Sequence, residues 1–203
     1  VTVLENNVEI RIKQSFGWSI YQPFAAADVI CTIDTSGELT IRCSVTTSNK
    51  VTFLPRFGLR FFLPKTFDRV DYFGYGPYES YCDKHRASYI GNFTSYVRDM
   101  HEDYTRPQEN SSHFGCTHMS VTDGNIHIGF EAGENFSFNA SEYTQEELAG
   151  KRHNFELEKC ASNVICIDHK MAGVGSNSCG PALAEEYRLE IPGFTAEFRV
   201  KIR

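Results

Sequence analysis

The chain has 203 residues, a formal net charge of -6 and 41% hydrophobic residues. This acidic balance argues against nucleic acid as a partner, because binding to a phosphate backbone depends largely on lysine and arginine. No apolar run approaches the roughly 20 residues that span a bilayer, and the N-terminus lacks the charged and apolar regions of a signal peptide. We therefore expect a soluble, cytoplasmic protein without a membrane partner.

The cysteines favour a reducing compartment. Seven cysteines, an odd number without a repeated short spacing, are spread over positions 31, 43, 82, 116, 160, 166 and 179. A chain of this size needs no disulfide to be stable, so reduced thiols are expected. Four Asn-X-Ser/Thr motifs begin at Asn92, Asn110, Asn135 and Asn139. Because such a short motif arises by chance, we interpret these sites as unmodified.

Apolar residues alternate with polar ones along much of the chain, which is the period of a β-strand with one buried face. The first such pattern runs from Cys31 to Val45, and the Asp-Thr-Ser-Gly stretch at 34–37 predicts a hairpin turn within it. The same alternation predicts strands around 57–63, 126–130, 155–157, 187–191 and 198–202. One helix is predicted, from a capping box at Thr144–Glu147 to Gly150.

Many short strands with little helix indicate an all-β protein, either a large antiparallel β-sandwich or a barrel. No linker-like change of composition divides the chain. Its length and apolar content suffice for one sizeable core, so residues 1–203 are predicted to form a single domain.

Several residue clusters could carry chemistry. The segment "DYFGYGPYESYCD" at 71–83 combines aromatic rings with carboxylates, which suits a sugar, although an aromatic-rich corner of a sandwich looks the same. His113, Cys116 and His118 lie close in sequence, with His101 upstream, but no second ligand pair follows, so no metal site is predicted. Cys166 and His169 are poorly placed to act as a nucleophile and base on one strand. Carboxylates available for acid–base work are Glu79, Asp83, Glu102, Asp103 and Glu109.

Four segments in order resemble one family. "YFGYGPYESYCD" at 72–83 resembles the G-x-G-P-x-E-x-Y-x-D signature in the C-terminal domain of lac-type bacterial β-galactosidases of glycoside hydrolase family 2. "YTRPQEN" at 104–110 and "FSFNASEYTQEEL" at 136–148 are similar to two further motifs of that domain. "GVGSNSCGP" at 173–181 stands where the family carries a glycine-rich loop. These motifs cover roughly the last two-thirds of the chain.

The resemblance implies a galactose-mutarotase-like β-supersandwich within a retaining β-galactosidase that acts on terminal β-D-galactosides. It places the catalytic glutamates in a separate, preceding TIM-barrel domain, so no catalytic residue is expected in this chain. It also implies no cofactor here, Mg and Na bound by other domains of the full-length enzyme, contacts with the preceding domains, and a homo-oligomer.

The glycine-rich loop is the predicted point of contact with substrate. In the family this loop reaches into the active-site cleft and carries a tryptophan, whose position corresponds to Cys179 here. Cysteine offers less apolar area to a sugar, whereas Asn177 and Ser178 offer hydrogen bonds. The predicted substrate-binding residues are Ser176, Asn177, Ser178 and Cys179.

Two other functions remain open at this stage. A stand-alone aldose epimerase would use a histidine and a carboxylate as acid and base, and His85, His113 and His118 are the candidates. Only fold analogy supports it. The other is a secreted, glycosylated carbohydrate-binding module, which the four Asn-X-Ser/Thr motifs would favour.

Overall fold

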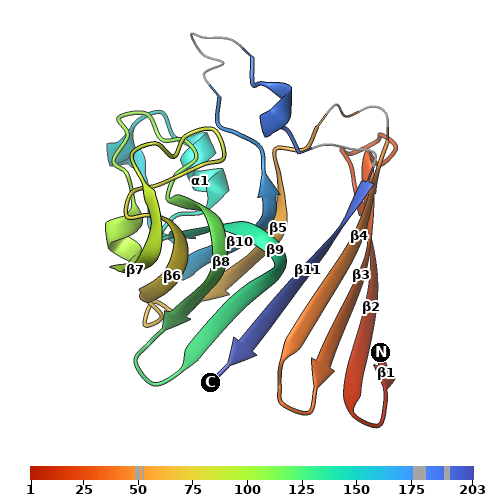
Figure 1. Ribbon diagram of the computed structural model, residues 1–203. Helices are drawn as coiled ribbons and strands as arrows, with labels where there is room; N and C mark the ends of the chain where they lie inside the picture. Colours follow the sequence, from red (N-terminus) through yellow and green to blue (C-terminus); the bar gives the residue numbers. More distant parts are fainter. Residues whose placement is uncertain (49–50, 52, 176–181, 190–192) are drawn as a thin grey trace.

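The computed structural model describes residues 1–48, 51, 53–175, 182–189 and 193–203. Its strands form one branched antiparallel sheet whose main path runs β1-β2-β3-β4-β11-β9-β8-β6-β7, with β10 joined to β9 and β5 joined to β10. Figure 1 shows the outer strands β2, β3 and β4 beside β11, and the group β6, β7 and β8 on the other side of β9. The predicted all-β antiparallel architecture is thus confirmed.

The elements have the following bounds. The first seven strands are β1 (Thr2–Val3), β2 (Asn7–Phe16), β3 (Ala25–Asp34), β4 (Leu39–Thr47), β5 (Arg56–Leu63), β6 (Arg69–Gly76) and β7 (Tyr89–Tyr96). The later strands are β8 (Ser112–Thr122), β9 (His127–Ser141), β10 (Asn163–Met171) and β11 (Gly193–Ile202). The helical segments are η1 (Val97–Met100), α1 (Gln145–Gly150), η2 (Asn154–Glu156) and η3 (Glu185–Tyr187).

Strand β9 is where the sheet forks. It is 15 residues long and pairs with β8 on one side along much of its length. On its other side, residues 128–132 pair with β11, whereas residues 137–141 pair with β10. The fork lets β10 and its neighbour β5 leave the plane of β11 and pack over it. Phe57 and Phe61 of β5 contact Phe194 of β11 and Phe130 of β9, with ring centroids about 5 Å apart.

The main core lies between these two layers. It includes four phenylalanines that are at most 2% exposed, Phe130, Phe136, Phe138 and Phe198. They come from β9 and β11, the strands that pair with each other beside the fork. Strand β10 is buried on both faces over Asn163–His169, as expected for a strand with neighbours on both edges and a layer on either side.

The sequence predicted the clearest elements correctly. Strands β3 and β4 form the expected hairpin, and the Asp34 carboxylate closes its turn by accepting hydrogen bonds from the amides of Ser36 and Glu38. Helix α1 begins as predicted, because the Thr144 hydroxyl accepts a hydrogen bond from the Glu147 amide at 3.1 Å. Strand β11 contains the predicted segment 198–202.

Two predicted strands are wrong. Residues 155–157 lie in and after the 3-10 turn η2, and the Phe155 ring is 82% exposed. Near 187–191 the chain forms the 3-10 turn η3, followed by a single bridge between Leu189 and Leu54, while Ile191 lies outside the described residues. Alternation over two or three residues occurs as readily in a tight turn as in a strand, so these short patterns carried little information.

The first thirty residues form β1, β2 and the start of β3 in the same sheet. Across the described ranges, no helix has the length and apolar character that a bilayer crossing requires.

Candidate functional site

The predicted substrate-binding residues Ser176, Asn177, Ser178 and Cys179 lie outside the described residues. The described residues on either side of them, Gly173–Gly175 and Leu183, line a cleft of about 530 Å³. We call it the loop-base cleft. Its other walls come from the predicted motif segments and from β10, and they include Glu79, Tyr81, Lys84, Glu109 and Met171.

Asp83, from the first motif, holds the start of the glycine-rich loop. Its carboxylate accepts hydrogen bonds from the amide of Val174 at 3.1 Å and from the amide of Gly175 at 2.8 Å. A Cβ atom at Gly173 would lie 2.5 Å from the Asp83 carboxyl carbon, and Gly175 has a φ of +58°. Glycine is therefore required at the first position by close approach and favoured at the second by backbone conformation.

Glu79 lies behind the cleft as a buried acceptor. Its carboxylate receives hydrogen bonds from the Lys84 ammonium at 2.6 Å and from the Tyr81 hydroxyl at 3.1 Å. The Tyr104 hydroxyl and the Ser111 amide donate to it as well. Since the side chain of Glu79 is only 4% exposed, these donors offset the loss of hydration that burial of a carboxylate causes.

The partners of Glu79 titrate outside their ordinary ranges. Burial raises the pKa of the Tyr104 hydroxyl, and the hydrogen bond to Glu79 raises it further. Burial alone would lower the pKa of Lys84, but its hydrogen bonds to Glu79 and Tyr104 outweigh burial, so the pKa is raised. At neutral pH Lys84 is therefore a cation and Tyr104 is a neutral donor. Both groups donate to the Glu79 carboxylate.

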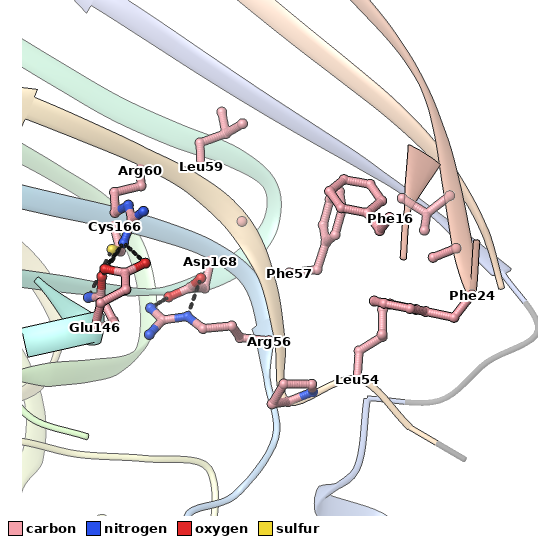
Figure 2. A pocket seen from close by; sticks show the side chains of 15 residues that line it. Phe16, Phe24, Leu54, Arg56, Phe57, Leu59, Arg60, Glu146, Cys166 and Asp168 are labelled. Atoms are coloured by element: carbon pink, nitrogen blue, oxygen red, sulfur yellow. Dashed lines mark hydrogen bonds and ion pairs between the residues drawn. The ribbon is translucent and has the colours of Figure 1, made fainter. Parts of the chain in front are cut away.

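A second polar cluster joins the remaining motifs. The Arg56 guanidinium donates to both oxygens of Asp168, to Glu109 at 3.0 Å and to the Asn139 side chain at 3.0 Å. Figure 2 shows the guanidinium facing the Asp168 carboxylate. The Asn139 amide in turn donates to Glu109 at 3.2 Å and to the carbonyl of Asn110. We call the Glu79 and Arg56 clusters together the motif brace.

The brace contains a carboxyl whose proton affinity is altered. Burial raises the pKa of Glu109 above its ordinary value, although the Arg56 guanidinium acts in the opposite direction. Asn110 and Asn139 are 2% and 1% exposed, and both amides are bonded within the protein. Two of the four Asn-X-Ser/Thr motifs are thus structural in the folded chain, which agrees with their interpretation as unmodified.

The structure brings together residues that the sequence treated separately. Glu79 and Glu109, proposed only as available carboxylates, line one cleft, and Asp83 holds the loop residues Val174 and Gly175 that form one of its walls. Glu102 and Asp103 do not line this cleft. Asp103 accepts a hydrogen bond from the Asn154 side chain at 2.8 Å. Sequence reasoning missed Arg56 and Asp168. The one available signal was an aspartate within the apolar run "NVICID" at 163–168.

Within the described ranges, no hydrogen bond or ion pair joins the histidines proposed for an epimerase to a carboxylate. His113 is 1% exposed and packs between the rings of Tyr72 and Phe138. Burial lowers its pKa to about 4. His85 contacts the Tyr81 carbonyl and the rings of Tyr75 and Phe114, and His118 stacks on Phe73 at the surface.

The Cys166 thiol and the His169 ring each contact other residues. Cys166 accepts a hydrogen bond from Gln145 at 3.3 Å, whereas His169 stacks on Phe194, so the two side chains have different partners. Burial raises the pKa of Cys166 to about 12, which keeps the thiol protonated. No group of three or more histidine, cysteine, aspartate or glutamate side chains within the described residues is arranged to hold a metal ion.

Comparison with known structures defines the class of protein first. The crystal structure of galactose 1-epimerase from Lactobacillus acidophilus NCFM superposes with a TM-score of 0.53 at 9% identity, covering 100% of this chain and 64% of the epimerase. At this identity the likeness concerns the fold alone. The chain is therefore a galactose-mutarotase-like β-supersandwich, as predicted.

Sequence comparison then gives the family. The chain matches the beta galactosidase small chain family over residues 2–202 and belongs to it. It is 40% identical over 197 residues to a β-galactosidase of Actinobacillus pleuropneumoniae, covering 97% of this chain and 19% of the relative. It is 34% identical over 201 residues to a β-galactosidase of Staphylococcus xylosus, covering 98% and 20% respectively. The chain thus spans about a fifth of the length of these relatives.

Proposed function

We propose that this chain is the C-terminal domain of a retaining β-galactosidase of glycoside hydrolase family 2, which hydrolyses terminal β-D-galactosides. The names of the relatives and the family match support the activity, and the fifth of their length that the chain spans supports a role as one domain among several. In this proposal the catalytic glutamates lie in a preceding barrel domain, and residues 1–203 form one domain that closes a side of the substrate pocket.

The glycine-rich loop is the part of the chain that contacts substrate in this proposal. The observation that carries this role is the attachment of the loop base to Asp83 through two backbone amides. A loop that presents groups to a ligand is useful only if its base is rigidly positioned. From this base, Ser176, Asn177, Ser178 and Cys179 would reach the sugar.

The hydrogen bonds within the motif brace favour a positioning role for Glu79 and Glu109 over a catalytic one. A general acid or base has to exchange its proton with substrate during the reaction. Glu79 instead accepts from four donors, and Glu109 is bonded to Arg56 and Asn139. The brace holds the cleft in shape, and we expect the chain by itself to be inactive.

Ions and partners belong to the rest of the enzyme in this proposal. Mg and Na would bind to other domains of the enzyme, and no cofactor is assigned to this chain. The chain would contact the preceding domains of its own polypeptide within a homo-oligomer.

The test is kinetic and uses the complete polypeptide that carries these residues. Cys179→Ala and Cys179→Trp are compared with the unchanged enzyme in hydrolysis of a chromogenic β-galactoside. We expect both variants to change KM, because the residue would contact the sugar.

Cys160→Ala serves as the control, since it removes a half-buried thiol at a distance in sequence from the loop and is expected to leave KM unchanged. Unchanged kinetics in both Cys179 variants would mean that the loop only connects two parts of the chain and does not contact substrate. Hydrolysis by the 203-residue chain alone would overturn the proposal, because the catalytic carboxylates would then lie within it.

A further inference from the structure

Strand β5 has a free edge in the middle of the molecule. It pairs with β10 on one side, and among the described residues no strand pairs with its other side. Charged side chains, lysine above all, and proline commonly protect a free edge. The sequence of β5, RFGLRFFL, contains neither lysine nor proline, and its two arginines are paired with Asp168 and Glu146. The backbone groups along this edge are therefore available to another strand.

A groove runs along this edge. It has a volume of about 450 Å³ and is lined on one side by Phe16, Phe24 and Val45, and on the other by Leu54, Phe57 and Leu59. Figure 2 shows Phe57 and Leu54 opposite Phe16 and Phe24, with the polar residues Arg60 and Glu146 towards α1. The walls of the groove are apolar where β5 faces β2–β4.

On the sheet that faces β5, the side chains become more exposed from β11 and β4 towards β2. Residues that lie in one row across β11, β4, β3 and β2 are Ala196, Cys43, Val29 and Ile12. Exposure rises along this row from 5% and 2% at Ala196 and Cys43 to 39% at Ile12, with Val29 half-buried. Phe16, on the same face of β2, is also 39% exposed. The layer that contains β5 therefore ends before the apolar face beneath it does.

One further strand beside β5 would fit both features. Strands in a sheet lie about 4.8 Å apart and sheets pack about 10 Å apart, so a strand added to β5 would extend this layer over the part of the sheet that lines the groove, β2–β4, and cover the exposed end of the row. Every pair in the described sheet is antiparallel, for example β5 with β10. The addition expected at this edge is thus antiparallel, with apolar side chains at every second position towards the groove.

Proteins of the same fold and family have further chain outside the part that matches these residues. The galactose 1-epimerase has about a third of its length outside the superposed part, and the β-galactosidase relatives have about four fifths of theirs outside the match. We propose that an extended segment of the same polypeptide, outside these 203 residues, adds to the free edge of β5 as an antiparallel strand and completes the sandwich over β2 and β3. This proposal is independent of the substrate-binding role of the glycine-rich loop.

Hydrogen exchange of single amides in the complete polypeptide tests it directly. An occupied edge makes all amides between Phe57 and Leu63 exchange at least about 100-fold slower than their intrinsic rates, like those of β10. An unoccupied edge leaves every second amide exchanging within about tenfold of its intrinsic rate, which would overturn the proposal.

Two other occupants would be recognised by the same experiment. Protection that is lost when the protein is diluted to a monomer would assign the edge to a second copy. Protection that requires added galactose would assign it to a ligand. Either result would overturn the proposal.

A matched pair of variants in the complete polypeptide gives a second readout. Ile12→Asp places a carboxylate under the proposed strand, whereas Ile90→Asp places one on β7, where the isoleucine is 55% exposed. We expect Ile12→Asp to lower Tm several times more than Ile90→Asp, because only the first carboxylate would be buried. Equal shifts would overturn the proposal, and if Ile12→Asp fails to fold, exchange in the unchanged protein still decides.

Discussion

The motif brace and the outer strands β2 and β3 differ in how completely their side chains are buried and bonded within the chain. In the brace, buried charges such as Glu79 and Arg56 are bonded to several partners from distant parts of the chain. On β2 and β3, apolar side chains that would be core residues elsewhere stay half exposed. The region that shapes the loop-base cleft is therefore bonded within the chain, whereas the outer strands keep apolar side chains partly exposed.

The largest expected difference between the two regions is in apolar packing. Phe138→Ala removes a fully buried ring and should lower the free energy of unfolding by about 4 kcal/mol. In the 203-residue chain, Phe16→Ala removes a ring from the uncovered face and should lower it by only about 1 kcal/mol. Chemical denaturation of both variants measures this difference. Equal losses in the two variants would mean that β2 is packed as tightly as the core.

The next effect concerns the buried ion pair of the brace. Asp168→Asn leaves the Arg56 guanidinium without its main counter-charge, and we expect a loss of about 3 kcal/mol in the free energy of unfolding. Asp28→Asn is the control, because Asp28 pairs with Lys13 at 4.0 Å on the surface of β2 and β3. It should change stability by about 0.5 kcal/mol or less. A small effect of Asp168→Asn would show that water reaches the brace.

Stability should also depend on pH through His113. Burial lowers its pKa to about 4 in the folded state, against about 6.5 in the unfolded state. Between these values the unfolded state binds the proton and the folded state does not, so stability falls as the pH falls from about 6.5 to 4, by roughly 2 to 3 kcal/mol.

Urea titrations at several pH values measure this slope. His113→Phe keeps an aromatic ring between Tyr72 and Phe138 and should remove most of the slope. His118→Phe changes an exposed histidine and should leave the slope unchanged. A slope that survives His113→Phe would assign the pH dependence to the carboxyl groups.

The smallest effect tests the clearest local signal in the sequence, the cap of α1. Thr144→Ala removes the hydroxyl that caps α1 and should lower stability by about 1 kcal/mol. Thr2→Ala, at the exposed end of β1, is the control and should have almost no effect. Thermal unfolding of both variants resolves the difference, and a neutral Thr144→Ala would show that packing of α1 makes its cap redundant.

Local patterns in the sequence were sufficient for much of the fold. Alternation and the turn at Asp34–Gly37 predicted the β3–β4 hairpin, and Thr144 predicted the start of α1. The same kind of pattern failed at 155–157 and 187–191, because two or three residues do not separate a strand from a turn. Those predictions that were right rest on interactions between residues close in sequence.

The site depended on longer connections. The ordered motifs identified the segments that meet at the loop-base cleft, but composition gave no sign that Asp83 would bind the glycine-rich loop or that Arg56 would join Asp168. These partners are 91 or more residues apart. Alternation tells which face of a strand is buried and does not tell which strand lies beside it.

By itself, the sequence therefore determined the strand period, the cap of α1, the order of the motifs and the family. The tertiary structure decided that β9 forks, that the motifs share one buried polar network and that β5 keeps a free edge. The physical reason is that strand order is set by pairing and packing between distant segments, whose free energy depends on the whole arrangement.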